Sequence, residues 1–520
     1  MKKRKGVSLI VLIITIIVVI ILAAAVILAL SKDGGIINKA RYAKDEYNKI
    51  EYRDRINEAY TIVKNKQEMQ GKPDREIFEE VKKSLNFEKA KYEICDKSMN
   101  ITTKEGYEYT ILGNGYIYDE KVVVLDIAEG NIDLYSNGYK QYTGALQGLN
   151  QNGATSFTGK YIITGTTTEN VVRVCDEGKY DITIKDLKID VGSSGDYANS
   201  SFNANAGSKA QNCYVNIALD GNNVLYSKGM AGIQFCGGNK NNVVETNRST
   251  LTISGDGALD TECKSGYDGA GIGGNYNSVP VCDIVINSGN IKAIGKSSGC
   301  GIGGGLRQPL GNITINGGKI IANGGYASGI GGDSVVINGG ELEFHGGEYG
   351  NAIISSKKLE INCGKIIAGT WSAYDAILSP NIEILGGTFN IQSLKKSGIV
   401  CKDGGNIKIS GGNILVNAKE NNISTYNNST SVPYTPTNGT DEIYLTQIKL
   451  PNDTANQKIE SITTSDNLQY GVKDMYTLED GMLYLYLPIG TREITIKVNG
   501  KVYAEEVETS QAGNCTIFSE

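Results

Sequence analysis

Two apolar patterns alternate along the middle of the chain. One is an isoleucine inside a glycine-rich turn, as in residues 329–332 (Gly-Ile-Gly-Gly). The other is a strand of alternating apolar and polar residues that ends in Gly-Gly, as in residues 313–318 (Ile-Thr-Ile-Asn-Gly-Gly). Alternation with a period of two is typical of a β-strand with one buried face. The turn isoleucines are Ile233, Ile272, Ile302, Ile330, Ile353, Ile377 and Ile399.

Both patterns recur with one period, which shortens along the chain from 39 residues to 22–25 residues. Such a period, with two or three short strands and no helix, is typical of one coil of a parallel β-helix. Coils stack about 4.8 Å apart, so equivalent side chains form ladders. We therefore predict a mainly β protein with a right-handed parallel β-helix over residues 126–420. The turn isoleucines should fill its interior, and Asn316, Asn338 and Asn362 should stack as a ladder of amides.

An apolar stretch at residues 7–30 follows a basic cluster at residues 1–5 and contains only Ser8 and Thr15 as polar residues. A helix of this length spans the hydrocarbon core of a bilayer. The basic cluster should stay in the cytoplasm, which places the rest of the chain outside the cell. A cleavable secretory signal would have a shorter apolar region, so we expect a membrane anchor.

Residues 5–10 (Lys-Gly-Val-Ser-Leu-Ile) resemble the signal of type IV pilins and pseudopilins. The resemblance implies cleavage between Gly6 and Val7, and a helix that serves as membrane span and as filament core among other pilin subunits. One position departs from the pattern, because Val11 stands where pilins usually carry Glu. An uncleaved signal anchor is the alternative.

Charge and composition exclude several function classes. The net charge is -6, and no dense Lys or Arg run occurs after residue 5, which argues against a nucleic-acid partner. His345 is the only histidine, which argues against mechanisms that need a His base or a Ser-His pair and against a multi-histidine metal site. The ten cysteines form no Cys-x-x-Cys pair, and we expect most of them to be small buried thiols.

Several stretches of the repeat resemble a large group of bacterial surface β-helix proteins described as carbohydrate-binding domain proteins. The stretches are residues 162–167 (Ile-Ile-Thr-Gly-Thr-Thr), 231–234, 251–257, 269–274 and 315–318. The resemblance implies binding of a cell-wall or plant polysaccharide without chemistry.

Aromatic residues near the turns are the candidate sugar-binding residues. Four tyrosines each lie three to five residues before a turn isoleucine, and a tryptophan lies close to the last of them. If these side chains align along one corner, they form a strip on which the face of a sugar could lie. The alternative is that they only cover the corner. The residues are Tyr267, Tyr326, Tyr349, Trp371 and Tyr374.

Catalysis and metal binding have weaker support in the sequence. Hydrolysis of a glycoside needs two carboxyl groups at a fixed separation, and no paired-Asp motif occurs. Residues 307–309 (Arg-Gln-Pro) lack the second Arg that a lyase motif would have at residue 312. Asp256, Asp268 and Asp283 could bind Ca²⁺ if they converged, although Asp is also common as a turn residue. No other cofactor is expected, and a polysaccharide lyase or hydrolase is the first alternative function.

We predict six segments: a basic leader at residues 1–6, a membrane or filament helix at 7–65, a small α+β head at 66–125, the β-helix at 126–420, a linker or coil-capping loop at 421–441, and a capping β-sandwich at 442–520. The expected protein is an adhesin on the cell surface, anchored in the bacterial membrane or in a pilus. A structural minor pilin that binds no glycan is the second alternative.

Overall fold

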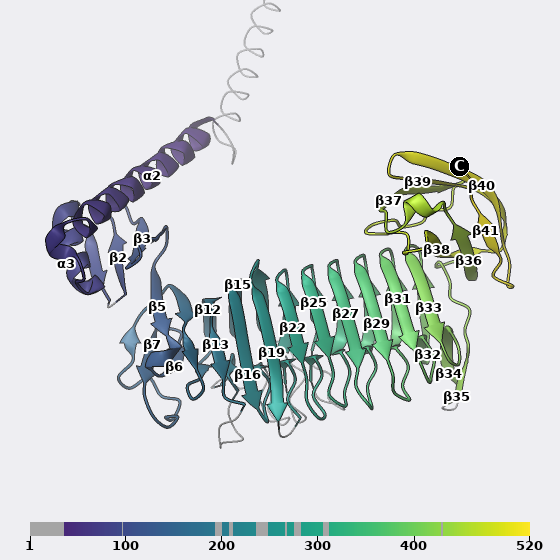
Figure 1. The fold of residues 1–520 in the computed structure, drawn as a ribbon, viewed down its shortest axis with the longest axis horizontal. Coiled ribbons are helices and arrows are strands. Elements are labelled where there is room, and N and C mark those ends of the chain that lie inside the picture. Colours follow the sequence, from purple (N-terminus) through teal and green to yellow (C-terminus); the bar gives the residue numbers. More distant parts are fainter. Residues whose placement is uncertain are drawn as a thin grey trace, which may run out of the picture. The chain divides into compact units, whose positions relative to one another are not determined.

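A computed structural model describes residues 36–95, 97–192, 200–206, 212–235, 248–265, 268–274, 282–304, 311–427 and 430–519. The fold is mainly β, and the chain divides into two compact units, Met1–Val123 and Val124–Glu520 (Figure 1). The predicted membrane span and the Gly6–Val7 cleavage site lie outside the described residues. Within the described residues, no helix has both the length and the apolar character that a membrane crossing requires.

The first unit packs helices against a small antiparallel sheet. Ile56, Tyr60 and Val63 recur at helical spacing on the second half of α2 and are buried against Phe78 and Val81 of α3. The helix α3 therefore packs against the second half of α2. The elements are α2 (Ile36–Lys64), η1 (Gln67–Met69), α3 (Asp74–Leu85), β1 (Lys91–Ile94), β2 (Ser98–Thr102), β3 (Glu108–Leu112) and β4 (Ile117–Tyr118).

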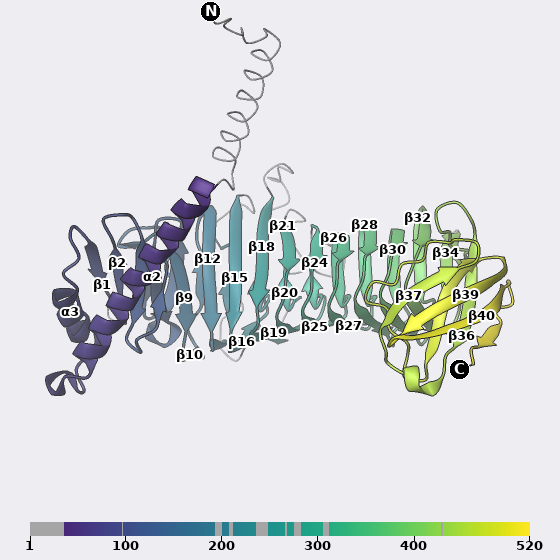
Figure 2. The same ribbon diagram turned by 90° about the horizontal axis from the view of Figure 1, so that it is seen from above.

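The repeats of the second unit build two long sheets whose strands follow the order of the chain (Figures 1 and 2). In the smaller sheet, each strand pairs in parallel with the equivalent strand of the next repeat. Its strands are β10 (Thr166–Thr167), β13 (Lys188–Asp190), β16 (Asn222–Lys228), β19 (Ala258–Ser265), β22 (Asn290–Ile294), β25 (Lys319–Asn323), β27 (Glu341–Gly346), β29 (Lys365–Thr370), β31 (Thr388–Ser393) and β33 (Asn413–Ala418).

The larger sheet contains two strand segments per repeat in the early repeats, which fuse into one long bulged strand from β26 onward. A 3-10 helix, η2 (Ile127–Glu129), follows its first strand. The sheet begins with β5 (Val122–Asp126), β6 (Asn131–Tyr135), β7 (Gly138–Tyr142), β8 (Thr155–Ser156), β9 (Lys160–Thr164), β11 (Val172–Val174), β12 (Gly178–Lys185), β14 (Phe202–Asn203) and β15 (Cys213–Asp220). It continues with β17 (Ile233–Gln234), β18 (Ser249–Gly255), β20 (Ile272–Gly273), β21 (Cys282–Ile286), β23 (Ile302–Gly303), β24 (Ile313–Ile315), β26 (Ile330–Ile337), β28 (Ile353–Ile361), β30 (Ile377–Ile384), β32 (Ile399–Ile409), β34 (Ile423–Asn427) and β35 (Thr430–Pro433).

The ladder of turn isoleucines is present in the register of the larger sheet. Ile330 pairs with Ile353, and Ile353 pairs with Ile377, and all three side chains are fully buried. The ladder also extends toward the N-terminus through Phe202 and Val172, where the irregular repeat length hides it in the sequence. Parallel strands that return to the same register once per repeat are compatible with a parallel β-helix.

The asparagine ladder is present as well. The Nδ2 of Asn316 donates to the Oδ1 of Asn287 at 2.7 Å, Asn338 donates to Asn316 at 2.8 Å, and Asn362 donates to Asn338 at 2.7 Å. Asn287, which the sequence did not single out, begins the ladder. Each inner member both donates and accepts, so the amides join successive repeats on the outer face of the sheet.

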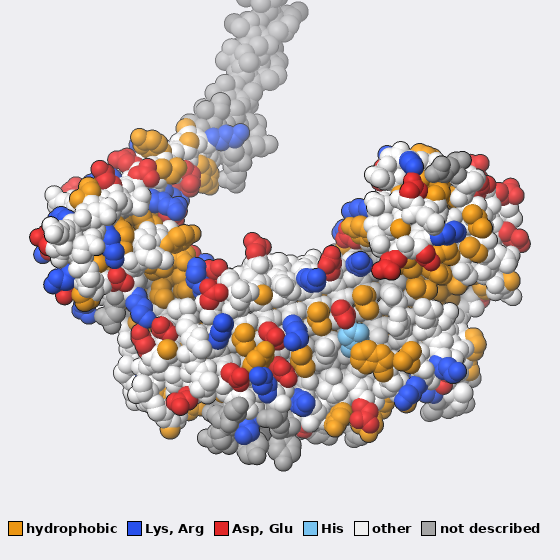
Figure 3. All heavy atoms as spheres, viewed as in Figure 1, with side chains coloured by type: hydrophobic (Ala, Val, Ile, Leu, Met, Phe, Trp, Pro, Cys, Tyr) orange, Lys and Arg blue, Asp and Glu red, His pale blue; other side chains and the backbone are white. Residues whose placement is uncertain are grey.

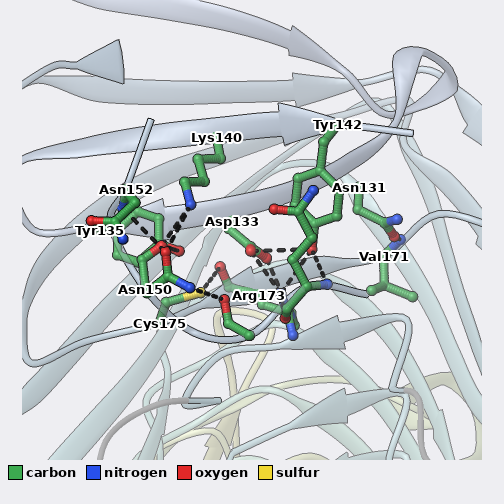
Figure 4. A network of polar contacts seen from close by, with 12 residues as sticks. Asn131, Asp133, Tyr135, Lys140, Tyr142, Asn150, Asn152, Val171, Arg173 and Cys175 are labelled. Carbon is green, nitrogen blue, oxygen red and sulfur yellow. Dashed lines mark hydrogen bonds and ion pairs between the residues drawn. The ribbon is translucent and has the colours of Figure 1, made fainter. Parts of the chain in front are cut away.

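A buried ion pair holds the first repeats together (Figure 4). The Arg173 guanidinium donates twice to the Asp133 carboxylate, at 2.7 and 2.6 Å, and once to the Tyr142 hydroxyl at 2.8 Å. Both charged side chains are almost fully buried, so each compensates the desolvation of the other. Nearby, Asn131 accepts a bond from the Val171 N–H, which ties β6 to the next repeat.

The last repeats continue into a C-terminal domain of two three-stranded sheets around one core. Asn499 and Gly500 both have positive φ in the two-residue turn of a β-hairpin. The segment expected as a linker or capping loop holds the β34–β35 hairpin, and β34 adds one more rung to the isoleucine ladder. The remaining elements are β36 (Ile443–Lys449), η4 (Asn452–Thr454), β37 (Ile459–Thr464), β38 (Met482–Pro488), β39 (Gly490–Val498), β40 (Lys501–Thr509) and β41 (Cys515–Ile517).

Candidate functional site

The aromatic side chains gather at the corner that follows the strands of the smaller sheet. We call this region the aromatic corner and define it by Tyr326, Tyr349, Trp371 and Tyr374. All four are at least 40% exposed, which is unusual for large aromatic side chains. Tyr326 and Tyr349 lie edge to face with ring centroids 5.7 Å apart. Tyr267, the fifth predicted member, lies outside the described residues.

Trp371 is the most exposed member of the corner, at 61%, and it is held in place by His345. The two rings are stacked, with centroids 5.0 Å apart and an angle of 11° between their planes. Figure 3 shows the single histidine, in pale blue, next to hydrophobic side chains. One ring face of Trp371 is therefore covered by His345 while much of the side chain remains accessible.

The backbone beneath His345 explains why its ring can take this position. His345 is the outward neighbour of Gly369 in the pairing of β27 with β29. A Cβ atom at Gly369 would lie 3.1 Å from the His345 Nδ1, so a larger residue there would crowd the imidazole. On its other side, the His345 Nε2 lies 2.7 Å from the Glu343 Oε1, which fixes the ring orientation.

A cavity of about 450 Å³ opens beside Trp371. Residues from four successive repeats contribute to its lining, so the cavity runs across the stacked strands. Asn323 comes from β25, His345 from β27, Ser372 from the corner after β29, and Lys395 from the corner after β31. The lining combines an aromatic platform with a few polar groups, as is common in ligand sites.

Tyr349 and Tyr374 are close enough to interact electrostatically. The Glu348 carboxylate beside Tyr349 raises the pKa of the Tyr349 hydroxyl, and Tyr326 and Tyr374 contribute in the same direction. The Tyr349 hydroxyl therefore remains neutral and can donate or accept hydrogen bonds at the surface of the corner.

Tyr426 lies on β34, in the β34–β35 hairpin, and interacts electrostatically with Tyr374 of the aromatic corner. Its hydroxyl donates to the buried Asp375 carboxylate, which also accepts from the Ser397 N–H at 3.1 Å. Burial raises the pKa of Asp375, and burial together with Asp375 raises the pKa of Tyr426. Tyr426 could not be predicted from the sequence, because its position depends on the register of a hairpin in a polar segment.

The candidate calcium ligands are not brought together. Asp283 forms an ion pair with Arg248 at 2.7 Å and accepts the Asn312 N–H at 2.7 Å. Asp268 accepts the Ser298 N–H at 3.1 Å, and Asp256 occupies a turn after β18. Across the described ranges, no group of three His, Cys, Asp or Glu side chains could hold a metal ion.

Most of the cysteines are buried thiols, as expected. Burial raises the pKa of Cys300 to about 12, which keeps its sulfur protonated. Among the described cysteines, Cys282 is part of a disulfide, Cys95 is half-buried and Cys515 is exposed. The thiols are Cys95, Cys175, Cys213, Cys263, Cys300, Cys363, Cys401 and Cys515.

No family model, no characterised protein and no solved structure matches the chain. Function is therefore inferred from the geometry of the aromatic corner.

Proposed function

We propose that the protein is an extracellular adhesin that binds a polysaccharide at the aromatic corner. The observation that supports this most strongly is the exposed Trp371 ring, stacked on His345 at the edge of a cavity of about 450 Å³. A ring held in one orientation loses little conformational entropy when a ligand covers it. An indole also offers an apolar surface that matches the C–H face of a pyranose.

The direction of the cavity favours a chain of sugars over a single small molecule. The repeats are stacked about 4.8 Å apart, a rise close to the length of one pyranose ring. Tyr326 and Tyr349 lie in successive repeats, so a glycan along the stack would meet one aromatic or polar group per repeat. Asn323 and Lys395 would supply hydrogen bonds to hydroxyl groups at the two ends of the cavity.

The same surroundings favour binding over catalysis. Among the lining residues, Glu348 is the one carboxylate, and it interacts with the neighbouring Tyr349 hydroxyl. Glycoside hydrolysis needs a second carboxyl group across the bond that breaks. We therefore propose that the corner retains polysaccharide without cleaving it.

The proposal includes the architecture and the location of the protein. The repeats are proposed to form a right-handed parallel β-helix that presents the corner outside the cell. The N-terminal segment is proposed to anchor it in the bacterial membrane or in a pilus, through the prepilin-like sequence around Gly6. The register of the two sheets supports the first statement, and the apolar stretch of residues 7–30 supports the second.

A role as a structural pilin subunit is the second candidate, and one surface favours it. The first half of α2 exposes an apolar stripe of Ala40, Ala43, Tyr47 and Ile50, on the side of the helix opposite Ile56 and its buried neighbours. Other pilin subunits would cover such a stripe in a filament. This role and glycan binding can coexist in one chain.

Retention on insoluble polysaccharides tests the function. The protein from residue 34 onward should be retained by at least one cell-wall or plant polysaccharide, and Trp371→Ala should reduce retention at least tenfold. Tyr214→Ala is the matched control, because Tyr214 is 38% exposed on β15, away from the corner. Equal retention of both variants would refute the site. Release of new sugar ends by the wild-type protein would favour the lyase or hydrolase alternative.

A further inference from the structure

The C-terminal domain docks onto the glycine corner that precedes the smaller sheet. The Gly387 N–H donates to the Lys473 carbonyl at 2.9 Å, and the Gly412 N–H donates to the Gly471 carbonyl at 2.9 Å. The Gly471 N–H donates in return to the Ser410 carbonyl at 2.8 Å. A short segment, residues 471–473, which leads into a turn at residues 472–475, thus binds two successive repeats through main-chain hydrogen bonds.

The same corner continues through the three preceding repeats without such a partner. Gly318, Gly340 and Gly364 have φ values of 98°, 107° and 120°, close to the 104° of Gly387, so their N–H groups have the same direction. Within the part of the chain that the structure describes, these three N–H groups have no hydrogen-bond acceptor. The corner therefore presents a column of main-chain donors, one per repeat.

These donors line a cavity of about 400 Å³ between the repeats and the C-terminal domain. Gly364 is buried there, and Asp474 and Tyr476 of the C-terminal domain form part of the opposite wall. A buried N–H without an acceptor is unfavourable, so an acceptor in this cavity would be stabilising. Lys365 and Glu341 also line the cavity, and they contribute one positive and one negative charge.

We propose that this cavity binds an extended polypeptide segment, whose carbonyl oxygens accept from the N–H groups of Gly364 and Gly340. The occupant would extend the pattern that Gly471 and Lys473 already make on the next two repeats. Glycine at these positions leaves the floor without side chains, so a second backbone can approach closely. Recognition through main-chain bonds is the usual mode by which a strand adds to an exposed sheet edge.

A peptide is favoured over a glycan because the chain itself supplies the precedent. The carbonyls of residues 471 and 473 accept hydrogen bonds from glycine N–H groups of adjacent repeats. The N–H groups of the three preceding repeats have the same arrangement. This site is separate from the aromatic corner, since none of its lining residues lines the cavity beside Trp371. The inference therefore does not depend on the proposed function.

Fluorescence anisotropy with a labelled peptide tests the site. The probe is an acetylated and amidated peptide with the sequence of residues 467–476, added to the full chain. Lys365→Trp should fill the cavity and weaken binding at least tenfold. Asn290→Trp should leave binding unchanged, because Asn290 occupies the same column of the smaller sheet two repeats before Glu341 and outside the cavity.

Three results would overturn the inference. The first is no saturable binding of the peptide, which would leave water as the acceptor. The second is equal binding by the Lys365→Trp and Asn290→Trp variants when both have the circular dichroism of the wild type. The third is displacement of the peptide by a neutral hexose oligosaccharide in the Trp371→Ala background, which would assign the cavity to sugar.

Discussion

Removing one inner member of the asparagine ladder should cost about twice as much as removing its first member. Asn338 makes two ladder bonds, one to Asn316 and one from Asn362, whereas Asn287 makes one. A hydrogen bond contributes about 1 kcal/mol net. Asn338→Ala should therefore lower the local opening free energy by about 2 kcal/mol, and Asn287→Ala by about 1 kcal/mol.

Amide hydrogen exchange measures this difference where it arises. Exchange in repeat structures reports local opening, and a change of 1.4 kcal/mol alters the rate tenfold. Amides of β26 and β28 should exchange about 30-fold faster in Asn338→Ala, against about fivefold for the amides near Asn287 in Asn287→Ala. Global denaturation is less suitable, because long repeat arrays need not unfold in one step.

The variant Asn338→Asp distinguishes the hydrogen bond that Asn338 donates from the one that it accepts. A carboxylate can still accept from Asn362 but cannot donate to Asn316, so its effect should lie near that of Asn287→Ala. If Asn338→Ala and Asn287→Ala change exchange equally, the amides do not stabilise the stack as a ladder. The reasoning would also fail if neither variant differed from the wild type.

Three further predictions concern the core and the buried charges. Ile353→Ala should lower the local opening free energy of the repeats by about 2–5 kcal/mol, because Ile353 is fully buried between two ladder isoleucines. The control Ile367→Ala, at a 37% exposed position, should lower it by less than about 0.5 kcal/mol in amide hydrogen exchange, and equal effects would refute the ladder as a core. Asp133→Ala should cost about 3–5 kcal/mol by leaving the buried Arg173 charge without its carboxylate partner, and a cost below about 1 kcal/mol would contradict the buried ion pair. Burial raises the pKa of Asp375, so the folded state binds its proton more tightly than the unfolded state. The stability of the wild type relative to Asp375→Asn should therefore increase as the pH falls from 7 toward 4. A decrease in the relative stability of the wild type over this range would show that the assigned direction is wrong.

The sequence predicted the repeats well because their signal is local and periodic. Ile330 and Asn338 recur at one spacing, and a parallel stack converts equal spacing into contact. Phe202 and Val172 belong to the same ladder but could not be found, because their repeats differ in length and replace isoleucine with other residues. Register depends on loop lengths that periodicity does not reveal.

The candidate site was predicted in part. Tyr326 and Tyr349 come together as the corner hypothesis required, since both lie at the same distance from a ladder isoleucine. The pairing of Trp371 with His345 was missed, although alternation along β27 places His345 on the outer face. The stacking of His345 on Trp371 also requires that residue 369 has no side chain. This requirement becomes visible only when the register of β27 and β29 is known.

Titration of the tryptophan signal with soluble oligosaccharides tests the central claim most directly. Trp371 is the single tryptophan of the chain, so selectively excited emission reports on the aromatic corner alone. The account predicts a saturable change in emission with fragments of the polysaccharide that retains the protein, and a weaker apparent affinity in His345→Ala, where the platform loses its support. Unchanged emission at saturation with such a fragment would contradict binding at Trp371 and would move the glycan site elsewhere.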